Sequence, residues 1–171
     1  GTKDDPFSIL TPANLYFLSQ NVGTDAYNTA YYVLESDIDL GGHEWTPIGN
    51  AETPFRGHFD GAGYSVNNFQ ITREQAYVGV FGLIENGIVS KLAVSNFTVN
   101  MQAADTEAVY IGSVAGKIQT KGTNILAEIT ECTADGTIRA SGDSLYVGGI
   151  VGEAIVSDDT MRLNIQNCYS L

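Results

Sequence analysis

Cationic residues are scarce in this chain. Its 171 residues include 8 Lys and Arg against 20 Asp and Glu, which gives a formal net charge of −12 at pH 7. Nucleic-acid binding relies on cationic side chains that neutralise phosphates, so this balance argues against a nucleic-acid partner. An anionic membrane surface is disfavoured for the same reason. The acidic excess is typical of a surface that keeps the protein soluble, and the alternative, more specific interpretation of the charge is cation binding.

Cysteine, histidine and long apolar runs are also lacking. Two cysteines are too few for a disulfide framework. Two histidines exclude a multi-histidine metal site within this chain. No stretch approaches the ~20 apolar residues of a membrane helix, so membrane insertion is not expected. Residues 1–6 are polar and contain no export signal, and we interpret this start as a trimmed end from which a signal could have been removed.

What the chain does contain fits one globular domain over residues 1–171. Hydrophobic residues make up 43% of it, enough for a real core at this length. Thr11–Gly23 is the best helix candidate, with Thr11 as N-cap and Pro12 at the first helical position. Leu15, Leu18 and Val22 form its apolar stripe. A single short helix ahead of a β region indicates a cap on one end of a stack.

Short strands follow, and residues 27–76 hold the first of them. Alternation places Ile38 and Leu40 on one face, and Gly41-Gly42 should end that strand. Phe55, Gly57 and Phe59 share a face, which puts His58 on the opposite face beside Arg56, where we expect it to be exposed. Asp60-Gly61 is a turn signal.

Three nearly identical segments begin at Tyr77, Tyr110 and Tyr146, so they lie 33 and 36 positions apart (77 to 110, 110 to 146). Each opens with Tyr-Val/Ile-Gly. Further strands are expected over residues 88–94, 97–101, 126–132, 137–140 and 163–168, with turns at Asn86-Gly87, Lys121-Gly122, Asp135-Gly136 and Ser141-Gly142.

This period predicts a parallel β-solenoid, in which each strand pairs with its counterpart one turn away. A β-sandwich is the main alternative, and a β-propeller is less favoured because its blades need four strands each. We expect the recurring glycines to be structural, either permitting positive φ at corners or allowing close backbone packing. The glycines that carry the repeat are Gly79, Gly82, Gly112, Gly116, Gly148 and Gly152.

The two cysteines keep the same period. Cys132 and Cys168 are 36 positions apart (132 to 168), so they should occupy equivalent places on neighbouring turns. A disulfide lies within reach at a strand spacing of about 4.8 Å, but parallel side-chain directions disfavour it. We therefore interpret them as two buried free thiols. The last strand, near Asn164–Tyr169, should have an unpaired edge, which further sequence or a second copy would cover.

Several segments together resemble the bacterial surface proteins that carry GLUG motifs. They occur in the order Asp37–Leu40, Trp45–Gly49, Phe55–Gly63 and Val78–Ile84, followed by repeats at Gly148–Gly152 and Ile165–Tyr169. The same run is similar to the non-catalytic region ahead of the protease domain in immunoglobulin A1-cleaving metallopeptidases. The resemblance covers about residues 11–171, with GLUG-like repeats over about residues 77–171.

This resemblance implies an exported or surface-anchored right-handed parallel β-helix whose N-terminal helix caps the first turn. It associates the chain with adhesion and host-facing display. The third unit stops at Leu171, so we expect a fragment of a longer exported protein or, as the alternative, a short domain with an unusual end.

Candidate catalytic and metal-binding residues are few. His43-Glu44 begins like a zinc-protease motif, but Pro47 replaces the second histidine and Gly41-Gly42 argues against a helix. Asp37, Asp39 and Asp60 could form the carboxylate patch of a polysaccharide lyase or glycosidase. Asp158-Asp159 could supply calcium ligands. Acidic residues in solvated edges and Asp-Gly turns explain these positions more simply.

We therefore predict a module without a catalytic centre or cofactor, with calcium left open, that is secreted or held on the bacterial cell surface. Its rigid stack would present side chains in rows to an extracellular protein or glycan, with exposed tyrosines as sugar contacts. A carbohydrate-active β-helix enzyme and a purely structural stalk are the two alternatives.

Overall fold

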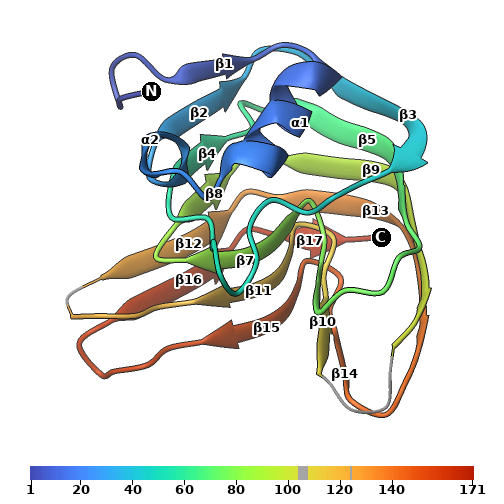
Figure 1. Cartoon of the computed structure of the whole chain (residues 1–171). Coiled ribbons are helices and arrows are strands. Elements are labelled where there is room, and N and C mark those ends of the chain that lie inside the picture. Colours follow the sequence, from blue (N-terminus) through green and yellow to red (C-terminus); the bar gives the residue numbers. More distant parts are fainter. Residues whose placement is uncertain (104–107, 124) are drawn as a thin grey trace.

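The computed structural model describes residues 1–103, 108–123 and 125–171, and it is almost entirely β (Figure 1). Two helices, α1 (Pro12–Asn21) and α2 (Asp25–Asn28), lie near the N-terminus. All strand pairings between named strands are parallel. The all-β prediction with parallel sheets is thus confirmed, and the predicted helix is present as α1. That helix does not precede all strands, since a strand at Phe7–Ile9 comes before it, and α2 was not predicted.

The strands form four sheets. The six-stranded sheet runs, in spatial order, through β1 (Phe7–Ile9), β2 (Tyr31–Leu34), β4 (His58–Asp60), β8 (Ile88–Ser90), β12 (Leu126–Thr130) and β16 (Arg162–Gln166). The five-stranded sheet runs through β17 (Tyr169–Ser170), β13 (Thr133–Ser141), β9 (Ala93–Gln102), β5 (Ser65–Ile71) and β3 (Ile38–Glu44).

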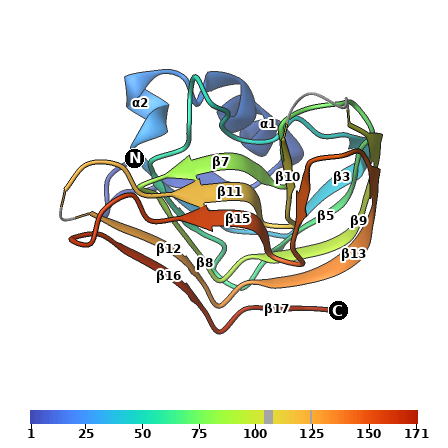
Figure 2. The ribbon, with the colours of Figure 1, turned by 90° about the horizontal axis from the view of Figure 1, so that it is seen from below.

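Two three-stranded sheets complete the fold. One contains β14 (Leu145–Val147), β10 (Val109–Ile111) and β6 (Tyr77–Val78), and the other contains β15 (Val151–Ile155), β11 (Ala115–Gln119) and β7 (Phe81–Glu85). From β4 onward the chain passes through the sheets in a fixed order: the six-stranded sheet, the five-stranded sheet, the β6 sheet, the β7 sheet, and then the six-stranded sheet again. One such passage, beginning at the six-stranded sheet, is called a circuit below. Figure 2 shows β7, β11 and β15 side by side, with the other sheets forming further sides.

The repeat seen in the sequence sets the register of this arrangement. Tyr110 pairs with Tyr77 on one side and with Tyr146 on the other, so the intervals read from the sequence are those of strand pairing. Because strands in a sheet lie about 4.8 Å apart, equivalent residues of successive circuits stand directly beside one another.

The core runs through the middle of these circuits. Phe55, Phe59 and Phe81 are at most 1% exposed, and the Phe81 ring centroid lies 5.0 Å from that of Phe55 and 5.3 Å from that of Phe59. Leu15 and Leu18 of α1 belong to the same core. Its inner side chains are aliphatic and aromatic, so burial of apolar area is the main stabilising term.

Helix α1 begins where the sequence predicted. Thr11 is the N-cap: its hydroxyl accepts from the Asn14 amide at 3.3 Å, and the Asn14 side chain accepts from the Thr11 amide at 3.1 Å. This reciprocal capping box satisfies two donors that a helix start leaves free. The helix packs against the first strands at the end of the molecule where the chain starts (Figure 1).

Several predicted strand boundaries were wrong. Gly41-Gly42 does not end its strand, because both residues adopt positive φ inside β3 as an irregularity in its pairing with β5. Asp135-Gly136 is likewise a register shift within β13 and not a turn. The strand predicted over residues 88–94 is split between β8 and β9 by Lys91 at φ 52°. Glu131 and Asn167, at φ 56° and 54°, make the same corner on the next two circuits.

The repeat glycines serve close packing. All the positive-φ glycines lie outside the repeat set. A Cβ on Gly112 would lie 2.3 Å from the Ala115 carbonyl oxygen, and one on Gly116 would lie 2.6 Å from that of Tyr110. Gly79, Gly82, Gly148 and Gly152 are crowded by backbone in the same way.

The cysteines lie on neighbouring circuits as free thiols. The prediction of two buried thiols holds for Cys132 but was wrong for Cys168, which is half-buried. The Cys132 amide donates to the Cys168 Sγ at 3.5 Å. Burial raises the pKa of the Cys132 thiol to about 12. Since the thiolate is the reactive form, the Cys132 thiol is expected to be unreactive at neutral pH.

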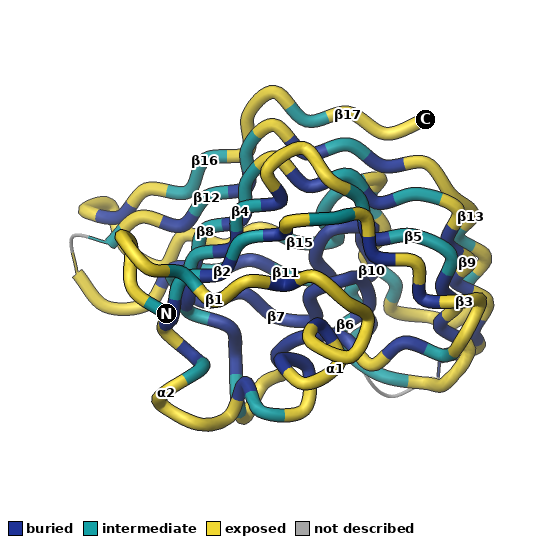
Figure 3. The backbone as a smooth tube through the Cα atoms, turned by 90° about the horizontal axis from the view of Figure 1, so that it is seen from above, coloured by how far each residue is buried: buried dark blue, intermediate teal, exposed yellow. Residues whose placement is uncertain are grey.

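The last circuit is open on its outer side. Within the described residues, β14, β15, β16 and β17 each pair with one neighbour. Figure 3 shows the exposed course of β17, and Val147, Ile155, Ile165 and Tyr169 are between 36% and 60% exposed. The predicted unpaired edge near Asn164–Tyr169 is therefore present.

An ion pair ties two circuits together near the core. The Arg56 guanidinium donates to Glu85 Oε1 at 2.6 and 2.9 Å, and Gln119 donates to Glu85 Oε2 at 2.8 Å. Glu85 is 5% exposed. Burial acts to raise the pKa of Glu85, but these hydrogen bonds and the Arg56 charge hold it below its ordinary value.

Removing Arg56 should leave this buried carboxylate short of partners. We expect Arg56→Ala to lower the free energy of unfolding by about 1–3 kcal/mol, measured by urea unfolding. Arg73→Ala is the control, since Arg73 is an exposed arginine and its removal leaves the hydrogen bonds to Glu85 in place. Equal, small losses for both variants would contradict this account of the pair.

Candidate functional site

The outer face of the six-stranded sheet presents side chains in straight rows. One row contains Tyr31, His58, Ile88, Glu128 and Asn164, each paired in register with the next. The neighbouring row contains Val33, Asp60, Ser90, Thr130 and Gln166. Gln166 is exposed and the other residues of the two rows are half-buried, so solvent can reach the side chains of both rows.

At the N-terminal end of these rows the surface is hollowed. A depression of about 280 Å³ is lined by Lys3, Tyr31, His58, Asp60, Ile88 and Ser90, among others. It combines an ammonium group, an imidazole, a carboxylate and a hydroxyl with a flat aromatic ring. A few convergent polar groups beside apolar surface are typical of a site that orients a polar ligand.

Tyr31 and His58 form the wall of this hollow. Their rings are stacked, with centroids 4.1 Å apart and planes 6° apart. The prediction that His58 is exposed beside Arg56 was wrong: His58 is half-buried against Tyr31, while Arg56 turns to Glu85. Burial, aided by Lys3 and opposed by Glu128, holds the pKa of His58 below its ordinary value of 6.5.

This shift has a consequence for stability. A histidine whose folded pKa is depressed favours the folded state above its unfolded pKa, near 6.5, and loses that contribution as the pH falls through its folded pKa. Between about pH 7.5 and about pH 5 we expect His58→Gln to reduce the acid-induced loss of unfolding free energy relative to the unsubstituted protein. The pKa of His58 measured by NMR should be below 6.5.

The exposed histidine His43 provides the matched control, since it lies in β3 away from the hollow. His43→Gln removes an imidazole outside the hollow, and the pH profile of His58→Gln is compared with that of this variant. An unchanged profile in His58→Gln, together with an NMR pKa at or above 6.5, would contradict the assignment of His58 to a desolvating site.

The repeated tyrosines form a second candidate surface. Tyr77, Tyr110 and Tyr146 stack with ring centroids 5.5 and 5.0 Å apart. The Lys117 Nζ lies 4.7 Å from the centroid of the Tyr110 ring and 2.7 Å from a Glu153 carboxylate oxygen. Because neighbouring rings cover one another's faces, a sugar could stack only at the two ends of the ladder, on the half-buried Tyr77 or on Tyr146, which is 46% exposed. This ladder therefore acts mainly as scaffold.

The three aspartates of the predicted acidic patch each accept hydrogen bonds from nearby groups. Asp37 accepts from the amide and hydroxyl of Ser65, which lowers its pKa. Asp39 accepts from the Gly41 amide and from Asn68, with the same effect on its pKa. Asp60 accepts from the Ala62 amide in the predicted turn. Among the described residues no group of three or more His, Cys, Asp or Glu side chains could hold a metal ion.

The Asp158-Asp159 pair considered for calcium lies in a turn between β15 and β16. Asp158 Oδ1 accepts from the amide and the hydroxyl of Thr160, each at 2.8 Å. These bonds lower the pKa of Asp158. The hydrogen bonds to Thr160 therefore assign Asp158 a role in forming the turn.

Comparison with known proteins gives two related sequences, while no family model matches the chain. A candidate Gly-rich membrane protein of Evansella cellulosilytica is 36% identical over 137 residues, which cover 75% of this chain and 15% of that protein. Halomucin of Haloquadratum walsbyi is 29% identical over 168 residues, covering 89% of this chain and 2% of the halomucin. The chain thus spans a small part of each relative.

A solved structure is also similar. It is a candidate immunoglobulin A1 protease from Bacteroides ovatus, at 14% identity and a TM-score of 0.42, and the match covers 99% of this chain and 76% of that one. Within the described residues, no helix is long and apolar enough to cross a membrane.

Tyr31 was missed as a site residue by sequence reasoning. The motif that contains His58 gave no sign that Tyr31, 27 positions earlier (31 to 58), would stack on it. The shared strand pairing of β2 and β4 is what brings the two rings together.

Proposed function

We propose that this chain is a right-handed parallel β-helix that acts as a non-catalytic binding module outside the cell and recognises glycans. The fixed order in which the chain visits its sheets supports the β-helix. Right-handedness is supported by a general rule, since ~98% of crossover connections between parallel strands have that hand. The GLUG-type repeat remains part of this proposal.

The hollow beside Tyr31 and His58 is the observation that carries the glycan assignment. Sugars offer apolar C–H faces to flat rings and hydroxyls to polar side chains. Tyr31, one face of which is stacked on His58, supplies the ring, while Lys3, Asp60 and Ser90 supply donors and acceptors. The rows beyond it continue with Thr130, Asn164 and Gln166, so an extended chain can meet uncharged polar groups on successive strands.

The charge of the chain favours a neutral glycan. At a net charge of −12, an anionic polysaccharide would be repelled from most of the surface. A setting at the cell surface is supported by the name of one relative, a membrane protein. The absence of a catalytic centre is supported by the acidic side chains, since Asp37, Asp39 and Asp60 are held by local backbone and side-chain donors.

A glycan array tests this function directly. The unsubstituted protein should bind neutral glycans, and Tyr31→Ala should weaken binding at least about tenfold because it removes the ring of the hollow. Tyr64→Ala is the matched control, since Tyr64 is 39% exposed and lies outside the hollow. Absence of binding, or equal binding by all three proteins, would refute the assignment of this site.

A further inference from the structure

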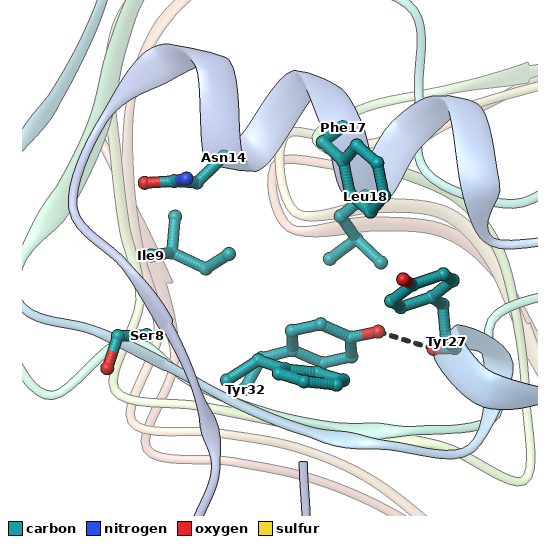
Figure 4. A pocket seen from close by; sticks show the side chains of 8 residues that line it. Ser8, Ile9, Asn14, Phe17, Leu18, Tyr27 and Tyr32 are labelled. Carbon is teal, nitrogen blue, oxygen red and sulfur yellow. Dashed lines mark hydrogen bonds between the residues drawn. The ribbon is translucent and has the colours of Figure 1, made fainter.

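A second pocket lies between α1, α2 and the first strands. It has a volume of about 230 Å³, and its walls include Phe7, Phe17, Tyr27 and Tyr32 (Figure 4). The Phe7 ring lies 5.8 Å from Tyr27 and 5.6 Å from Tyr32, centroid to centroid, and Phe17 meets Tyr27 edge-on at 5.2 Å. The Tyr32 hydroxyl is occupied, since it donates to the Tyr27 carbonyl oxygen at 2.6 Å.

The mouth of this pocket is apolar and open. Phe7 is 40% exposed and Phe17 is 49% exposed, whereas the floor residues Ile9 and Leu18 are at most 3% exposed. Drug-sized ligands need pockets of about 300–1,000 Å³, so this volume suits a single large side chain. Its aromatic walls favour an aromatic one.

The pocket lies beside an unpaired strand edge. Among the residues that the structure describes, β1 is the outermost strand of the six-stranded sheet and pairs with β2 alone. The Ile9 carbonyl oxygen accepts from the Glu35 amide at 3.1 Å, toward β2. Because successive residues of a strand direct their backbone groups to opposite edges, the amide and carbonyl of Ser8 face the open edge.

Strand register places this edge and the pocket together. Phe7, Tyr32 and Phe59 occupy one column across β1, β2 and β4. A strand added beyond β1 would set its own residue next to Phe7, about 4.8 Å further along the column. That position is the mouth of the pocket, so an aromatic residue there would extend the aromatic column by one member.

From this juxtaposition we propose that the β1 edge and its pocket bind an extended peptide segment of a partner protein. The segment adds a strand to the sheet and inserts one aromatic side chain into the pocket, a mode in which backbone hydrogen bonds supply affinity and the pocket supplies specificity. Glu35, whose carboxylate accepts from the Ser8 hydroxyl, and the net charge of −12 favour a segment with basic flanks. This inference is independent of the glycan proposal.

Capped heptapeptides of sequence Lys-Thr-Val-Xaa-Val-Thr-Lys provide the probe. With Xaa as phenylalanine the peptide should bind, and NMR amide shifts should centre on residues 7–9, 17–18 and 27. With Xaa as alanine the affinity should fall at least about tenfold, because the aromatic ring is no longer buried. A phenylalanine peptide N-methylated on the edge that pairs with β1 should lose binding to a similar extent, since it keeps the ring but cannot donate.

Two protein variants sharpen the test. Ser8→Pro removes the amide on the open edge, a place where edge strands tolerate proline, and Phe17→Ala removes a pocket wall. Each should weaken the phenylalanine peptide about tenfold, while Tyr64→Ala leaves it unchanged. The N-methylated peptide keeps the edge test valid if Ser8→Pro unfolds.

Three results would overturn the proposal: no peptide binds, alanine and phenylalanine peptides bind equally, or the shifts centre elsewhere. A fourth is that N-acetylphenylalaninamide binds as tightly as the phenylalanine peptide, which would make the pocket a site for small aromatic molecules.

Discussion

Phe81→Ala is expected to lower the free energy of unfolding by about 3–5 kcal/mol, the range for a fully buried phenylalanine. The side chain is 0% exposed and packs against Phe55, which lies before β4 on the preceding circuit, and against Phe59 in β4 of its own circuit. Removing it opens a cavity where two circuits share one aromatic cluster, and the surrounding strands are too constrained by pairing to collapse into it. Urea unfolding followed by circular dichroism measures the change.

Tyr64→Ala is the control for this loss. It also removes an aromatic ring, but from a side chain that is 39% exposed. Its cost should be within about 1 kcal/mol. A loss below about 1 kcal/mol for Phe81→Ala would mean that this aromatic cluster does not hold the circuits together.

Gly82→Ala should lower the free energy of unfolding by about 3 kcal/mol or more, because the added methyl group would overlap neighbouring atoms. Its Cβ would lie 2.2 Å from the Gly49 carbonyl oxygen and 3.3 Å from the Cβ atoms of Pro47 and Tyr77. The Gly49 oxygen cannot retreat, since it accepts from the Leu83 amide at 3.1 Å. The same unfolding measurement applies, and loss of soluble folded protein would be the extreme form of this result.

Gly63→Ala separates crowding from backbone strain. Gly63 adopts φ +87°, and a Cβ added there would have nothing within 4 Å, so alanine at this position meets conformational strain alone. We expect about 1–2 kcal/mol for it. If Gly82→Ala cost no more than Gly63→Ala, close packing of backbone would not be the reason for the repeated glycines.

The sequence predicted the features that repeat or that rest on local chemistry. The intervals between Tyr77, Tyr110 and Tyr146 predicted the register of three paired strands correctly. In a parallel stack, residues one sequence period apart lie on adjacent strands. Thr11 and Pro12 marked the start of α1 because helix capping needs only adjacent residues.

The corners between sheets were harder to predict. Lys91 and Glu131 adopt left-handed conformations that are usual for glycine or asparagine, so no turn signal marked them. Strand pairing on both sides imposes this geometry, and its cost is offset by the hydrogen bonds of the flanking strands. Asn167, at the equivalent corner, was the sole member of the three with a recognisable residue type.

The candidate site depended on contacts between distant residues. Tyr31, His58 and Ser90 come from three strands that the six-stranded sheet brings together, and Lys3 joins them from the segment before β1. Glu85 has the same character, since its partners Arg56 and Gln119 come from neighbouring circuits. Alternation alone placed His58 on an outer face, but it could not show that Tyr31 covers the imidazole.

Non-catalytic glycan recognition is the central claim, and binding and cleavage measured on one sample test it most directly. The protein is incubated with a neutral glycan selected on the array and, separately, with acidic polysaccharides, and both retained glycan and newly formed reducing ends are quantified. We predict saturable retention of the neutral glycan, weakened by Tyr31→Ala, with reducing ends at the level of the protein-free blank. Reducing ends that increase with protein concentration, or no retention of any glycan, would contradict the account.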